Sequence, residues 1–183
     1  KFIEVDSNLT TSMKSVGETM SIGRCFAESL QKGFASLEYD LDGLDIPKNI
    51  SLKKENIIKE LKKQSSQRLL VVGESLRLGI KKEEICELTK YDPWFIEEVN
   101  SIVDLEKIIK KNELNKETLL FAKSKGFSDK KIAGLLNIHE INIRKLRHKL
   151  DIRPVFRLVD TCAGEFDSKT PYLYSTYDWN FQN

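Results

Sequence analysis

Apolar residues recur at helical spacing through the whole middle of the chain, residues 52–150, and this pattern constrains the fold more than any other feature. Repeats three or four residues apart predict amphipathic helices, whereas strands would show alternation. Strand signals are almost absent from this region. We therefore expect a mainly α fold. The expected helices cover residues 51–63, 66–78, 81–89, 92–111, 116–125, 129–136 and 140–150.

The longest of these helices has a clear start signal. Asp92 can accept a backbone N–H as the N-cap, and Pro93 fits the first helical position, where its missing donor is not needed. We expect one apolar stripe to face the core, formed by Phe95, Val99, Ile102, Val103 and Ile109. The acidic residues expected on the opposite side are Glu97, Glu98, Asp104 and Glu106. Gly79 and Gly126 have the positions expected of glycines that end helices.

The two ends of the chain differ from this helical middle. Phe26, Leu30, Phe34 and Leu37 predict an amphipathic helix over residues 22–38, with Arg24, Glu28, Gln31 and Lys32 on its polar side. Residues 39–49 contain a glycine, a proline and three aspartates, and are the best candidate for a domain boundary. From Val155 onward, β-branched and aromatic runs favour extended strands or a linker.

Composition gives no global argument for a nucleic-acid or membrane partner. Thirty Lys+Arg against 28 Asp+Glu leave a net charge of +2. Cys25, Cys86 and Cys162 are far apart and odd in number, which favours reduced thiols over a disulfide framework or a zinc site. No apolar run approaches the roughly 20 residues of a spanning helix. We expect a soluble, cytoplasmic chain, and its start at Lys1 suggests a piece of a longer protein.

The residues supply little material for catalysis. The chain has no phosphate-binding glycine loop, no zinc-protease motif and no nucleophile elbow. His139 and His148 lie among charged residues and are expected at the surface. Cys162, with Asp160 and Glu165 near it in sequence, could act as a nucleophile, but no histidine or cationic neighbourhood is placed to activate it. We therefore predict no catalytic, cofactor-binding or metal-binding residue in this chain.

One segment, residues 129–150, has the outline of a helix-turn-helix. Ile132, Leu135 and Leu136 would face the core from the first helix, and Ile143, Leu146 and Leu150 from the second, with residues 137–139 as the turn. Residues 125–153 carry eight basic and three acidic side chains, so the patch could meet DNA phosphates. Glu140 and Asn142, however, occupy positions that normally read bases. A free-standing DNA-binding module remains the alternative to a helical interaction module.

Several segments resemble the large chain of carbamoyl phosphate synthase, in the order in which that family carries similar segments. They are LTTSMKSVGETMSIGR at residues 9–24, ESLQKGF, YDPWFIEEVNSIVDLEK, AKSKGFSDKKIAGLLN, IRKLRHKLDIRPVFRLVDTCAGEF and YLYSTY. The resemblance runs nearly end to end and is weakest over residues 38–63. It implies a small all-helical oligomerisation domain flanked by extended tails that belong to neighbouring ATP-grasp halves.

By that resemblance, residues 1–37 are the closing tail of the carboxyphosphate half, 38–158 the oligomerisation domain, and 159–183 the connector into the second half. The whole ligase makes carbamoyl phosphate for arginine and pyrimidine synthesis from bicarbonate, ATP and ammonia. A glutaminase small chain releases that ammonia from glutamine. ATP, with Mg or Mn, binds in the two halves, so no cofactor is expected here. The implied partners are those halves, the small chain and further copies, with no nucleic acid and no membrane.

The resemblance also implies one set of site residues. Met13 and Val16 resemble residues that line the internal passage through which carbamate moves between the halves. An apolar lining would limit hydrolysis of that intermediate; the alternative is that both are ordinary core residues. For self-association, the exposed apolar candidates are Leu76, Leu78, Ile80, Trp94 and Ile96. An isologous dimer is the default arrangement.

Overall fold

The computed structural model describes residues 8–14, 19–37, 40–48, 50–111, 114–167 and 171–178, and confirms the expected mainly α fold. The described residues form eight helices and one two-stranded sheet. These elements are α1 (Phe26–Ser36), α2 (Lys54–Lys62), α3 (Arg68–Arg77), α4 (Lys82–Thr89), α5 (Pro93–Lys111), α6 (Lys116–Ser124), α7 (Asp129–Leu136), α8 (Glu140–Lys149), β1 (Val155–Leu158) and β2 (Leu173–Thr176).

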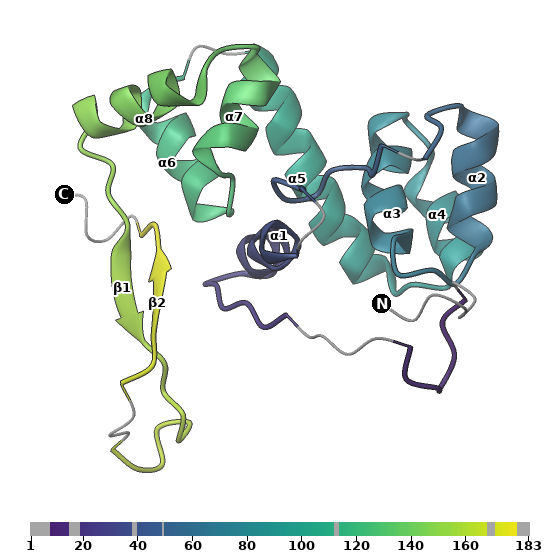
Figure 1. Cartoon of the computed structure of the whole chain (residues 1–183), viewed down its shortest axis with the longest axis horizontal. Helices are drawn as coiled ribbons and strands as arrows, with labels where there is room; N and C mark the ends of the chain where they lie inside the picture. Colours follow the sequence, from purple (N-terminus) through teal and green to yellow (C-terminus); the bar gives the residue numbers. More distant parts are fainter. Residues whose placement is uncertain are drawn as a thin grey trace.

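Helix α5 is the central element of the fold. Figure 1 shows α2, α3 and α4 grouped along one end of α5, with α6, α7 and α8 at the other end and α1 beside it. Contacts of α5 with α1, α3, α4 and α7 agree with this view. Since α5 is packed on several sides, it buries more than one stripe. Its buried residues are Ile96, Val99, Ile102, Val103, Leu105, Glu106 and Ile109.

The start and stop signals read from the sequence are confirmed. Asp92 Oδ1 accepts the backbone N–H of Trp94 at 2.8 Å, and α5 begins at Pro93. Gly79 follows α3 with a φ of +75°, and Gly126 follows α6 with a φ of +88°. Only glycine adopts such angles without strain, which explains why these helices end there.

The expected burial is wrong for four apolar residues in or beside α3 and α5. Phe95 is 43% exposed, because it lies in the first turn of α5, where its ring meets Phe26 and Trp94. Ile96, expected at the surface, is fully buried, since α5 is packed on more than one side. Leu76 and Ile80 are buried where α3 enters the core, whereas Leu78 and Trp94 are exposed as expected.

The segment before α2 is packed into the core. Leu41 and Leu44 are buried, and Leu44 lies over α3 at Gly73, where an added Cβ would come within 2.9 Å of the leucine side chain. A larger residue than glycine at position 73 would therefore push Leu44 out of place. Residues 40–48 thus pack against the helices and do not form an exposed linker.

Helix α1 differs from the expected helix in both extent and orientation. It begins at Phe26 and not at residue 22, and the extended residues before it are held by Glu28 Oε2, which accepts the backbone N–H of Arg24 at 2.6 Å. Its buried residues are Ala27, Glu28 and Gln31. The expected apolar face, from Phe26 to Phe34, is only half-buried. Of the polar side that was expected to meet water, Glu28 and Gln31 pack inward, whereas Arg24 is exposed.

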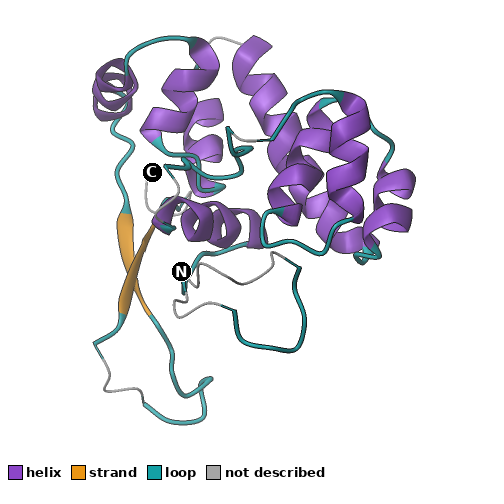
Figure 2. Ribbon diagram, turned by 45° about the vertical axis from the view of Figure 1, so that its right-hand side comes forward, coloured by secondary structure: helices purple, strands orange, loops and turns teal. Residues whose placement is uncertain are grey.

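The chain ends in an antiparallel hairpin that projects from the helices (Figure 2). The register pairs Val155 with Thr176 and Leu158 with Leu173. Side chains on one face alternate with those on the other. Phe156, Leu158 and Leu173 are exposed on one face, and Arg157 and Thr176 are covered on the other. The strand expectation is confirmed for these residues.

Candidate functional site

A buried ionic junction joins the two groups of helices. Glu106 of α5 accepts two hydrogen bonds from Arg77 of α3, at 2.7 Å from Nε and 2.8 Å from Nη2. The second glutamate oxygen also pairs with Lys131 Nζ of α7 at 3.0 Å. Lys131 pairs in addition with Asp45, and Arg77 donates to the backbone carbonyl of Leu44. The junction therefore ties α3, α5, α7 and residues 40–48 together.

The electrostatics of the junction favour its charged form. Burial alone would raise the pKa of Glu106, but the hydrogen bonds and positive charges of Arg77 and Lys131 outweigh it and hold that pKa below its usual value. Burial opposes the charge on Arg77 as well, yet its bonds to Glu106 leave the pKa of Arg77 raised. Each charge is buried only because its partners are present.

A second, half-buried carboxylate organises the α6–α8 end. Asp129 pairs with Lys123 at 2.8 Å and with Arg147 at 3.0 Å, and Arg147 also donates to the backbone carbonyl of Ile152. The ring of Tyr177 lies 5.1 Å from Lys123 Nζ and 5.8 Å from the Arg147 guanidinium. Burial raises the pKa of Asp129, but these two cations outweigh it and lower the pKa overall. Residues after the hairpin are thus attached to the helical body.

Sequence reasoning missed both junctions, and in one case it placed the residue on the wrong face. Glu106 was expected opposite the apolar stripe and is buried within it. Its partners Arg77 and Lys131 lie 29 and 25 positions away in the sequence. The available signal was local: Glu106 stands between Leu105 and Ile109, where an unpaired glutamate would be costly.

The helix-turn-helix outline is present as a fold, since α7 and α8 pack against each other with Asn137 in the left-handed turn. Of its basic residues, Arg144, Lys145, Lys149 and Arg153 are exposed, whereas two others are used inside the protein. Lys131 and Arg147 are buried in the two junctions, and Lys130 pairs with Asp42 at 3.1 Å. Glu140 is exposed at the first turn of α8. The exposed charges on and just after α8 are therefore the only observation here in favour of the DNA-binding alternative.

The candidates for catalysis remain isolated. His139 and His148 are exposed, and Cys162 has near it Asp160, whose Oδ1 accepts the Cys162 backbone N–H at 3.0 Å. Within the described part of the chain, no group of three or more His, Cys, Asp or Glu side chains could hold a metal ion. No helix in that part is long and apolar enough to cross a bilayer.

Of the two residues inferred to line the carbamate passage, only Met13 lies within the described part of the chain. Met13 is 79% exposed in an extended segment, with no cover from the helices. Val16 lies outside the described residues. A passage lined by Met13 would therefore need a second wall from polypeptide other than the part described here.

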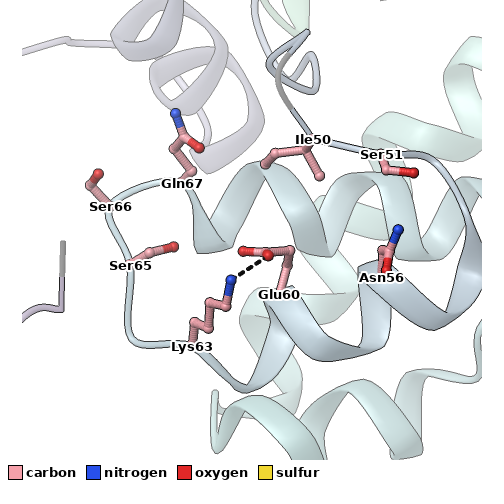
Figure 3. Close-up of a pocket in the computed structure, with 8 residues that line it drawn as sticks. All are labelled: Ile50, Ser51, Asn56, Glu60, Lys63, Ser65, Ser66 and Gln67. Carbon is pink, nitrogen blue, oxygen red and sulfur yellow. Dashed lines mark hydrogen bonds and ion pairs between the residues drawn. The ribbon is translucent and has the colours of Figure 1, made fainter.

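A polar cleft of about 580 Å³ lies between α2 and α3. Figure 3 shows Ser51 and Asn56 at one end and Ser65, Ser66 and Gln67 at the other, with the ion pair of Lys63 and Glu60, 2.5 Å long, between them. The cleft offers hydroxyl and amide groups but no histidine to activate them. It is a polar surface hollow without a catalytic constellation.

Comparison with known proteins gives a consistent result. The profile of the family described as carbamoyl-phosphate synthetase large chain, oligomerisation domain, matches residues 18–151. The chain is 47% identical over 178 residues to the carbamoyl phosphate synthase large chain, N-terminal section, of Aquifex aeolicus (strain VF5), covering 97% of this chain and 32% of that protein. It is 45% identical over 184 residues to the carbamoyl phosphate synthase large chain of Buchnera aphidicola subsp. Acyrthosiphon pisum (strain APS), covering 97% and 17%. The chain thus spans less than a third of the length of these relatives.

Proposed function

Since the chain belongs to the carbamoyl phosphate synthase large-chain family and contains its oligomerisation domain, we propose that it connects and spaces two synthetase halves and carries a self-association surface. The proposed whole enzyme is a cytoplasmic ATP-dependent ligase. It makes carbamoyl phosphate from bicarbonate and from ammonia that a small chain releases from glutamine. ATP and its metal ion would bind in the halves, and this segment would supply no catalytic group.

The observation that carries the spacing role is the contact between the segment around α1 and the C-terminal hairpin with the residues that follow it. Lys32 of α1 donates to the backbone carbonyl of Ser175 in β2 at 2.6 Å. Arg24, just before α1, pairs with Asp178 at 3.3 Å, and Arg157 of β1 pairs with the same carboxylate at 2.6 Å. The segment that enters the helices and the segment that leaves them are therefore held side by side. Two halves attached to these segments would start from a fixed separation.

Sedimentation over a concentration series tests the self-association role. We expect both the 183-residue segment and the large chain that carries it to form larger species as concentration rises. If the large chain associates while the segment stays monomeric, the self-association surface lies in another domain. A large chain that is monomeric throughout would remove self-association from the proposal.

We also propose that Met13 and Val16 contribute to the carbamate passage. The support is the resemblance of the MKSV motif together with the exposure of Met13, which leaves that side chain available to a neighbouring domain. Met13→Lys or Val16→Asp in the large chain should then raise the amount of ATP hydrolysed per carbamoyl phosphate formed. Lys14→Gln is the matched control in the same motif. An unchanged ratio in a folded variant would exclude the lining role.

A further inference from the structure

The end of α5 and the α7–α8 pair form an apolar groove of about 570 Å³, which we call the α5–α8 groove. Its apolar residues come from three places: Leu114 follows α5, Leu136 and Ile138 lie at the end of α7, and Leu146 is on α8. Ile138 is 44% exposed and the other three are half-buried. Figure 1 shows these helices at the end of α5 away from α2, α3 and α4. The described chain thus leaves this apolar area open.

Lysines of two helices flank the α5–α8 groove. Lys110 and Lys111, in the last turn of α5, line it directly. On α8, Lys145 and Lys149 each follow a lining residue by three positions, which places them next to the groove. All four lysines are exposed, and none of the described residues that line the groove is acidic. The groove therefore combines apolar walls with positive charge.

The charges of these four lysines are not used within the protein. Lys123, Lys131 and Arg147, from the same end of the molecule, each bind a carboxylate in the two junctions. None of the four lysines beside the groove forms an ion pair within the described part of the chain. Unpaired lysines are common on protein surfaces, but these surround apolar area that is open to a partner. Charge complementarity then favours a partner that is both apolar and acidic.

An amphipathic helix with acidic flanks has this chemistry. Such helices place apolar residues at i, i+3, i+4 and i+7 in grooves of this kind, and Asp or Glu beside them would face the lysines. A second copy that presented the same groove would bring lysines against lysines, which is unfavourable. A DNA duplex would meet the lysines but would leave the apolar residues without a partner.

The position of the groove favours a partner from another polypeptide. The segments through which the chain enters and leaves the helices are both held at α1, where Lys32 donates to the backbone carbonyls of Ile22 and Ser175. Neither segment contributes a residue to the groove. We propose that the α5–α8 groove binds an acidic amphipathic helix of a separate protein. This role goes beyond the spacing and self-association roles and depends on neither.

Peptide binding to the intact large chain, at concentrations where sedimentation shows no change in size, tests the proposal. The probe is a synthetic helix with leucine at i, i+3, i+4 and i+7 and glutamate elsewhere; the control peptide has lysine in place of each glutamate. We expect the acidic peptide to bind at least about tenfold more tightly, and to weaken as salt is added. Equal binding of the two peptides, no binding of the acidic one, or tighter binding of a DNA duplex would overturn the proposal.

Two double variants of the large chain locate the charge contribution. Lys110→Glu with Lys111→Glu should weaken binding of the acidic peptide at least about tenfold, because like charges would then meet. Lys53→Glu with Lys54→Glu is the matched control, since it reverses two adjacent exposed lysines at the start of α2, outside the groove. Equal losses would mean a general attraction of the acidic peptide to a basic protein, and the groove would not be the site.

A third comparison tests the apolar walls. Ile138→Ser should weaken peptide binding at least about fivefold, whereas Leu78→Ser, at an apolar position of similar exposure on the other group of helices, should not. An unchanged affinity for the Ile138 variant would exclude the groove as the binding site.

Acetylation of the large chain without peptide completes the test. Lys110 should react as fast as Lys53, since both are exposed in this segment. Strong protection of Lys110 would mean that another part of the same chain already covers the groove, which would overturn the assignment to a separate protein.

Discussion

Helices α5 and α1 both bury a glutamate, but the partners of the two glutamates and the burial of the neighbouring apolar residues differ. In α5, Glu106 lies among buried aliphatic residues and binds cations from two other helices. In α1, Glu28 binds Lys32 of the same helix and the backbone of Arg24, and the phenylalanines are half-buried. Glu106 therefore holds distant elements together, whereas Glu28 stabilises the start of its own helix. The difference separates the helical body, whose elements are held together by a shared carboxylate, from the end segment around α1, where the glutamate has local partners.

The largest expected effect comes from removing the carboxylate at the centre of the body. Glu106→Gln leaves Arg77 and Lys131 buried without their shared anion, and should lower the free energy of unfolding by about 3–5 kcal/mol. Urea titration of the 183-residue chain measures this. Glu97→Gln is the control on the same helix; its pair with Lys82 is exposed, so its loss should change the free energy of unfolding little. Similar losses for the two variants would show that the junction does not hold the helices together.

Ile96 and Trp94, two nearby positions on α5, should give losses of unfolding free energy of intermediate size. Ile96→Ala should cost about 2–4 kcal/mol, because Ile96 is fully buried and its removal leaves a cavity. Trp94→Ala should cost no more than about 1 kcal/mol in the same 183-residue chain, since it removes an exposed ring and its contacts with Phe26 and Phe95. A larger cost for Trp94 than for Ile96 would mean that the ring cluster of Phe26, Trp94 and Phe95 is already part of a closed core. Thermal or urea unfolding provides both values.

These contrasts also show how far the sequence could be interpreted. The helices from α2 to α8 were predicted to within a few residues, because caps such as Asp92 and stops such as Gly126 act over a few neighbouring positions. The inward face of α1 could not be predicted, since periodicity tells which residues share a face but not which face is covered. The Glu106 junction was missed for a related reason: its bonds join helices far apart in sequence, and a lone charged residue in an apolar stripe does not identify its partners.

The smallest expected effect is the pH dependence of the free energy of unfolding, to which the carboxylates of both junctions contribute. The pKa values of Glu106 and Asp129 are lowered in the folded protein. Their contribution to stability is therefore complete above the carboxyl pKa of the unfolded chain, about 4, and is lost as the pH falls through the folded values. Over that acidic range the unfolded state binds more protons, so stability should decrease on acidification. Each group contributes at most about 1.4 kcal/mol per pH unit to this slope.

Glu106→Gln should make that slope shallower while leaving the part that comes from Asp129. Asp129→Asn should do the reverse, and the double variant should remove both, since the two carboxylates share no partner. Glu28→Gln serves as the comparison from α1, where the pairing stays within one helix. If Glu28→Gln lowered the free energy of unfolding near neutral pH as much as Glu106→Gln, the α1 pair would contribute to global folding as strongly as the junction. The division between the helical body and the end segment would then be wrong.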